Sequence, residues 1–226
     1  MIKKVDSKGS CAYYEAESVS DITDLDVGGE FLSAGCSKLI IKGAGLDLCG
    51  REILRKNIAE LYSVRIQYRA IPGQLIQVPR IEDASDVVVM PCCTSFIRDL
   101  YLNKVMEFYA EWGFDVSHDR VAFSRDVAQY KLLAENSLCL AKKSVPVGLT
   151  TLYERDEPKS YCLNWIWFSA ELTRTERAQA HYLTVAWLRE KGQVIDAFVD
   201  SFNVKSMKFF QKIGFRPACL HITKKS

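Results

Sequence analysis

The sequence lacks the signatures of several protein classes. Its eight cysteines form no Cys-x-x-Cys pair, and none has a histidine at zinc-ligand spacing, so we expect no metal site and no disulfide framework. No apolar run approaches the roughly 20 residues that span a bilayer. The first residues are positively charged but no apolar segment follows them, which argues against a signal peptide. We therefore expect a cytoplasmic protein with reduced thiols and no membrane contact.

The sequence also has almost no net charge. It contains 30 lysines and arginines against 28 aspartates and glutamates, a balance of +2, which gives no overall attraction to nucleic acid. Internal repeats and low-complexity runs are absent. With 226 residues, 48% of them apolar and 26% charged, the chain has the composition of a globular protein. A chain of this length buries enough surface to fold without covalent staples.

The second half of the sequence has the clearer pattern of elements. Periodicity and turn residues predict strands at 87–90, 137–141, 145–153, 161–168, 194–199 and 215–222. The valine-rich strand at 87–90 is predicted to be buried, and the turn at 142–144 is predicted to join its two neighbouring strands in a tight hairpin. They predict helices after Thr94 or Ser95, at 124–135, at 175–191 and at 203–213. In the first half they predict a strand at 39–41, a helix at 46–61 and a hairpin of 64–69 with 75–78. We therefore expect a small α/β region of unknown role over 1–85 and a second domain over 86–226.

The C-terminal segment carries a recognisable motif. Asn203, Ser206, Phe210 and the closing Gly214-Phe215 follow a strand at a fixed spacing. This motif and the order of elements from Val87 resemble the GNAT superfamily of CoA-dependent N-acetyltransferases. The resemblance implies an α/β (α+β) fold with a mixed central sheet flanked by helices. It also implies an enzyme that transfers an acetyl group from acetyl-CoA to an amine acceptor by direct attack, without a metal.

The resemblance also suggests where acetyl-CoA would bind. A helix N-terminus suits a pyrophosphate, and the family places this site at the start of the helix at 175–191. Glu176 stands where the family has its first glycine, while Arg174 and Arg177 can pair with phosphate oxygens. An ordinary helix start, capped by Thr173 or Thr175, is the alternative interpretation. The predicted donor-binding residues are Phe168, Arg174, Thr175, Arg177, Ala178, Asn203, Ser206 and Phe210.

The proton-transfer groups are less clearly indicated. Many family members protonate the leaving thiolate with a tyrosine where this chain has Phe210, so Tyr153 or Tyr161 is an alternative acid. A general base must reach the attacking amine, and carboxylates near the strand ends are the natural candidates. We predict as catalytic residues Glu154, Glu171 and His118, with Asp156 and His181 as further candidates.

Several residues allow more than one interpretation. The cysteines are typical of core filling, although Cys92 or Cys93 can be a catalytic thiol. Trp165 and Trp167 suit a core or an acceptor wall. A basic stretch suits a solvated face or a rim for the 3′-phosphate of CoA: Lys205, Lys208, Lys212, Arg216, Lys224 and Lys225. The rival functions are a GNAT-fold transferase with another acyl donor, such as an aminoacyl-tRNA, and an inactive binding module. A homodimer also stays open.

Overall fold

The computed structural model describes residues 2–8, 11–18, 20, 22, 27, 29, 36–43, 46, 62–78, 86–111, 132–155, 159–200 and 202–224. The chain forms two compact units, which are described separately. One unit joins Met1–Ala70 to Asp196–Ser226, and the other is Ile71–Ile195. Among the described helices, none is long and apolar enough to cross a membrane.

The unit Ile71–Ile195 is built on four antiparallel strands. They lie side by side in the order β8 (Ser160–Phe168), β7 (Val145–Arg155), β6 (Ser137–Lys142) and β5 (Val87–Val89). Lys143 and Ser144 form the tight turn between β6 and β7, and both have positive φ angles, of 49° and 66°. Such a turn matches the twist of the two strands, which confirms the hairpin predicted there.

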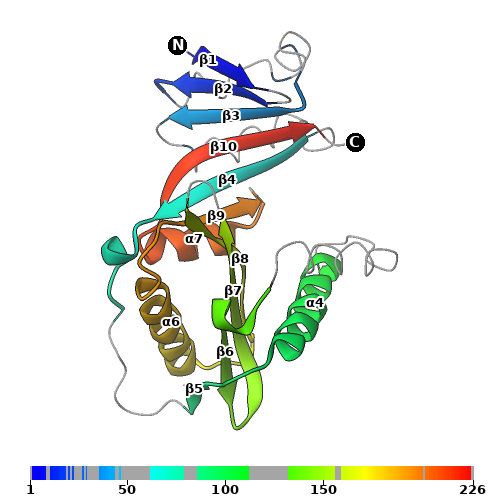
Figure 1. Ribbon diagram of the computed structural model, residues 1–226, viewed down its shortest axis with the longest axis vertical. Coiled ribbons are helices and arrows are strands. Elements are labelled where there is room, and N and C mark those ends of the chain that lie inside the picture. Colours follow the sequence, from blue (N-terminus) through cyan, green and yellow to red (C-terminus); the bar gives the residue numbers. More distant parts are fainter. Residues whose placement is uncertain are drawn as a thin grey trace. The chain divides into compact units, whose positions relative to one another are not determined.

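Two helices cover the opposite faces of this sheet (Figure 1). Helix α4 (Thr94–Glu111) packs Ile97, Tyr101 and Val105 against a face that includes Cys139 and Leu149. Helix α6 (Arg174–Arg189) packs Ala180 on the other face, where Leu138, Leu140 and Val147 point. Neighbouring residues of β6 alternate between the two cores, as the period of two in a strand requires.

The unit of Met1–Ala70 and Asp196–Ser226 contains a mixed sheet. Its strands are ordered β1 (Ile2–Lys8), β2 (Cys11–Ala16), β3 (Lys38–Gly43), β10 (Arg216–Lys224), β4 (Tyr62–Ala70) and β9 (Ile195–Asp200). Strands β2 and β3 are parallel, while β10 is antiparallel to both β3 and β4. Helix α7 (Val204–Lys212) buries Phe210 against Tyr68 of β4, with ring centroids 5.9 Å apart. This mixed α/β architecture confirms the predicted fold class.

Most elements of the second half occur where the sequence predicted them, with two corrections. The hairpin of 64–69 with 75–78 does not form, because β4 pairs with β10 and Pro72–Gln74 is a short 3-10 helix. Strand β5 was expected to be buried, but Val88 and Val89 are 57% and 52% exposed, since β5 pairs with β6 at an edge.

Other expectations are not tested by the structure. Nearly all of the predicted helix at 46–61 and most of the one at 124–135 lie outside the described residues. The compact units run differently along the chain from 1–85 and 86–226, because β4 lies beside β10. The division into two domains at these positions therefore stays a prediction.

Candidate functional site

The N-terminus of α6 is closed by a reciprocal pair of hydrogen bonds. Thr173 is the N-cap, and its hydroxyl oxygen accepts from the backbone N–H of Glu176 at 3.3 Å. The carboxylate of Glu176 accepts in turn from the backbone N–H of Thr173 at 2.9 Å. This capping box satisfies two of the amide groups that a helix start otherwise leaves open. The capped start that the sequence allowed as an alternative is present.

Glu176 also carries a firmly held negative charge. The Nζ atom of Lys142, at the end of β6, lies 2.6 Å from Oε1 of Glu176, whose side chain is 11% exposed. The hydrogen bond from Lys142, together with that from the N–H of Thr173, lowers the pKa of Glu176 to about 2. The carboxylate is therefore ionised at physiological pH, next to the positive end of the helix dipole.

The other residues predicted at this helix start are partly engaged within the chain. The guanidinium of Arg177 donates to the carbonyl oxygens of Ser169 and Ala170, at 3.0 and 3.4 Å. Arg174 and Thr175 are the first two residues of α6 and are exposed, and Ala178 is half-buried one turn later. Arg174 is thus the more accessible arginine of the predicted pair.

Strand β8 contains a bulge in the middle of its pairing with β7. Thr151 lies opposite Trp165 and Leu152 lies opposite Leu163, so Asn164 is the extra residue. Within the described part of the chain, three buried side-chain atoms around the bulge have no hydrogen-bond partner: Asn164 Nδ2, Trp165 Nε1 and Thr151 Oγ1. Bulges often re-aim side chains next to active sites, and buried unpaired polar groups are uncommon. The bulge therefore brings three buried polar atoms without partners to one place in the sheet.

A second group of titratable side chains lies where β7 ends and β8 begins. The hydroxyl of Tyr161 donates to Oε1 of Glu154 at 3.1 Å, and burial together with this hydrogen bond raises the pKa of Tyr161. The ammonium of Lys191 lies over the rings of Trp187 and Tyr161, 4.3 and 5.6 Å from their centroids. Burial lowers the pKa of Lys191. Glu154 is exposed, so its carboxylate is accessible to solvent and to a ligand.

The predicted residues of α7 act first as local structure. Asn203 is the N-cap, and its Oδ1 accepts from the backbone N–H of Ser206 at 3.1 Å. Phe210 is 3% exposed and packs between Tyr68 and Phe215. Phe210 therefore belongs to the core of its unit.

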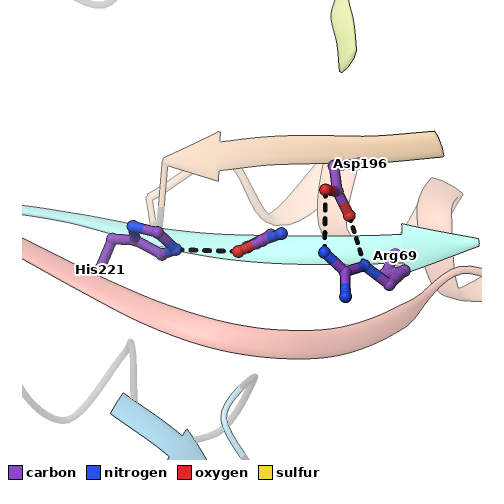
Figure 2. Close-up of polar contacts among 4 residues, drawn as sticks. Arg69, Asp196 and His221 are labelled. Atoms are coloured by element: carbon purple, nitrogen blue, oxygen red, sulfur yellow. Dashed lines mark hydrogen bonds and ion pairs between the residues drawn. The ribbon is translucent and has the colours of Figure 1, made fainter. Parts of the chain in front are cut away.

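Polar side chains also form a row across one face of β9, β4 and β10, here called the polar ladder: Arg65, Gln67, Arg69, Asp196, Asp200 and His221. Arg69 donates two hydrogen bonds to the buried carboxylate of Asp196, at 2.7 and 3.0 Å, and Arg65 donates one to Asp200 at 2.8 Å. Figure 2 shows the Arg69 pair together with His221, whose Nε2 lies 3.0 Å from Oε1 of Gln67. The ladder combines paired charges with a buried histidine.

Comparison with known proteins places the fold. No protein-family model matches the sequence, and no curated protein is significantly similar to it. A GCN5-related N-acetyltransferase from Sphaerobacter thermophilus matches 99% of this chain and 76% of its own length, with a TM-score of 0.50 and 11% identity. The chain has the GNAT fold.

Other solved structures are similar to lower degrees. A conserved protein of unknown function from Staphylococcus epidermidis has a TM-score of 0.49 and 15% identity, over 96% of this chain and 84% of its own. An aminoglycoside N-acetyltransferase in complex with CoA has a TM-score of 0.42 and 16% identity, over 61% of this chain and 93% of its own. At these identities the likeness concerns the GNAT fold alone.

Within the GNAT fold, the predicted site residues fall into separate groups. The start of α6 brings together Arg174, Thr175, Arg177 and Ala178, while Phe168 ends the preceding strand. Glu171 is exposed in the turn between β8 and α6, whereas Glu154 lies at the far end of β7 beside Tyr161. His118 and Asp156 lie outside the described residues, and His181 packs edge-on against Phe168 with centroids 5.0 Å apart. The roles assigned to these residues stay predictions.

Other residues of the candidate site were not predicted from the sequence. In the sequence, Lys142 stands in a stretch typical of a turn and Asn164 is a polar position in an aromatic strand, and neither pattern indicates a functional role. The alternation of Arg65, Gln67 and Arg69 with apolar residues indicated one polar face of a strand. Acidic residues at matching positions of β9 were a further signal, but their pairing depends on which strands become neighbours.

Proposed function

We propose that this protein is an N-acyltransferase that moves an acetyl group from a thioester donor, acetyl-CoA in the first instance, to a primary amine. The GNAT fold supports this class of reaction. The observation that carries the proposal is the bulge in β8, where Asn164 Nδ2 and Trp165 Nε1 are buried N–H donors without partners among the described residues. Donors of this kind can hold the oxygen of a thioester carbonyl. The amine acceptor, the cytoplasmic location and a homodimer remain predictions.

The reaction balances without a covalent enzyme intermediate. The amine nitrogen attacks the thioester carbonyl carbon, and a C–N bond forms while negative charge develops on the carbonyl oxygen. The C–S bond then breaks, and the thiolate leaves. The side-chain N–H groups of Asn164 and Trp165 would stabilise the developing oxyanion, which is the largest contribution expected in a water-poor site. The nitrogen must lose one proton, and the thiolate gains one from solvent or an acid.

Glu154 is our preferred base because its carboxylate is exposed and already bonded to Tyr161. Asn164 lies three residues beyond Tyr161, which corresponds to roughly 10 Å along an extended strand. A proton from an amine held at the bulge would therefore need intervening water to reach Glu154. Phe210 is buried and has no ionisable group, so it has no part in proton transfer.

The test is release of free thiol in the presence of amines. The full chain is incubated with acetyl-CoA or S-acetyl-pantetheine and a panel of small amines and lysine peptides. The released thiol is measured with a chromogenic thiol reagent. We expect Asn164→Ala to lower kcat at least about tenfold with little change in KM, since the lost contact forms with the transition state. Gln74→Ala, on an exposed 3-10 turn, is the control and should leave kcat unchanged. Absence of amine-dependent thiol release from either thioester would overturn the proposal in favour of a binding module.

A further inference from the structure

At the start of α6, some of the hydrogen-bond donors that could bind an anion are already bonded within the chain. An open helix start offers free N–H groups and the positive end of the helix dipole to phosphate. Here the N–H groups of Thr173 and Glu176 both donate within the capping box, at 2.9 and 3.3 Å. The side chains of Glu176 and Thr173 therefore each occupy one hydrogen-bond donor that a phosphate would otherwise use.

The start of α6 also already has a negative charge beside it, the carboxylate of Glu176. The Glu176 carboxylate is nearly buried and lies 2.6 Å from the ammonium of Lys142. The strongly lowered pKa of Glu176 keeps it negative throughout the physiological range. A diphosphate brought to the same backbone amides would meet this like charge, and like charges repel most where water is scarce.

The nearby cations do not reverse this balance. Lys142 is paired with Glu176, and Arg177 donates to the carbonyl oxygens of Ser169 and Ala170. Arg174 is exposed at the first position of the helix, where solvent and salt screen its attraction for phosphate. The start of α6 thus resembles an anion site whose anion is supplied by the chain itself.

We propose that Glu176 closes the start of α6 to a nucleotide diphosphate, so that the acyl donor is recognised through its pantetheine thioester arm with no diphosphate bound at α6. The inference rests on the proposed function, because it specifies the donor of that same reaction. Its donor class is an acyl pantetheine thioester in which the nucleotide contributes little or is absent. In this chain Glu176 is a specificity-determining residue rather than a catalytic one.

The first experiment compares ligands on the unaltered protein by titration calorimetry. S-acetyl-pantetheine and acetyl-CoA should bind with dissociation constants within about threefold of each other, a difference of less than one factor of ten. Acetyl-CoA binding more than about tenfold tighter would overturn the inference if the second experiment also shows diphosphate contact at α6.

The second experiment uses inorganic diphosphate and the backbone amide signals of Arg174 and Thr175 in NMR spectra. In the unaltered chain we expect no shift of these signals. Glu176→Gly frees the N–H of Thr173 and removes the carboxylate, so we expect diphosphate-dependent shifts and acetyl-CoA binding at least about tenfold tighter, with S-acetyl-pantetheine binding unchanged. Shifts in the unaltered chain, or no gain of diphosphate binding in the variant, would overturn the inference.

Two further variants guard against loss of folding. Glu176→Gln keeps an oxygen that can accept from the N–H of Thr173 but removes the charge, so it should show a smaller gain in the same direction. Glu190→Gln removes a negative charge at the other end of α6, and we expect it to leave the binding of acetyl-CoA and of S-acetyl-pantetheine unchanged. If neither thioester binds the unaltered chain, the proposed function fails, while the diphosphate signals still decide whether Glu176 closes the helix.

Discussion

Arg69 and Asp196 form a two-pronged ion pair between residues 127 positions apart in the sequence. The carboxylate is almost fully buried, with 1% of its side chain exposed, whereas Arg69 is about half exposed at 49%. The hydrogen bond to Asp196 raises the pKa of Arg69. The pair connects β4, in the first third of the chain, to β9 near its end, and so joins distant segments into one compact unit.

Arg69→Ala should destabilise this unit strongly, because it leaves a buried carboxylate without its partner. We expect a loss of about 3 kcal/mol, the lower end of the range for broken buried pairs since Arg69 is partly in water. Arg69→Lys should lose less, because a lysine keeps the charge but not the two-pronged geometry. The measurement is urea denaturation. Arg65→Ala, which breaks a more exposed pair with Asp200, should cost no more than about 1 kcal/mol, and an equal loss in both variants would contradict this account.

The pair of Lys142 and Glu176 should make stability depend on pH in acid. Because the pKa of Glu176 falls from 4.5 to about 2 in the folded chain, its ionised form stabilises the fold above pH 4.5. This contribution is lost as the pH falls from 4.5 towards 2. Glu176→Gln should therefore have a lower Tm than the unaltered chain near pH 7, and the difference should shrink over that interval. Melting curves followed by circular dichroism measure it, and a constant difference down to pH 2 would contradict the assignment.

Gly43 should resist replacement, unlike Gly73. A Cβ atom at Gly43 would lie 2.7 Å from the carbonyl oxygen of Ala16 on the neighbouring strand, and this contact involves backbone that cannot move aside freely. Gly43→Ala should therefore cost about 1–3 kcal/mol. At Gly73 a Cβ would meet nothing within 4 Å, so Gly73→Ala should change stability by less than about 0.5 kcal/mol. Urea denaturation of both variants measures the two losses of stability, and equal losses would contradict the prediction.

Two cysteines should differ sharply in reactivity. Cys93 is exposed, and hydrogen bonds from Ser95 and from the backbone N–H of Phe96 lower the pKa of its thiol. Burial raises the pKa of Cys139 to about 12. Because the thiolate is the reactive form, iodoacetamide should modify Cys93 in the folded protein and Cys139 only after unfolding. Peptide mass spectrometry measures both sites, with Cys93→Ser as the control, and modification of both at similar rates would contradict the prediction.

The local patterns of the second half were strong enough to predict most of its elements. Apolar periodicity and turn residues placed β6, β7, β8, α6, β9, α7 and β10 within a few residues of their bounds. The exposed edge strand β5 was misjudged, because a run of valines is typical of buried strands and the sequence does not show which strands end a sheet. The predicted hairpin after β4 was also wrong, because Pro72-Gly73 suits several kinds of turn and does not show which strand pairs with β4.

The candidate site divides in a similar way. The threonine cap of α6 and the asparagine cap of α7 were predictable, because a capping residue acts within its own helical turn. The salt bridge of Glu176 with Lys142 was not predictable, because the two residues are 34 positions apart and only the packing of α6 on β6 brings them together.

The sequence by itself therefore determined the order of strands and helices, the caps of α6 and α7, and the resemblance to the GNAT superfamily. These depend on neighbours a few residues apart, whose spacing is written in the chain. The tertiary structure decided that β4 lies beside β10, that Arg69 meets Asp196, and that Lys142 holds the carboxylate at the start of α6. Such pairs form between segments far apart in the chain, where many partners have suitable chemistry and the packing of the whole sheet selects one.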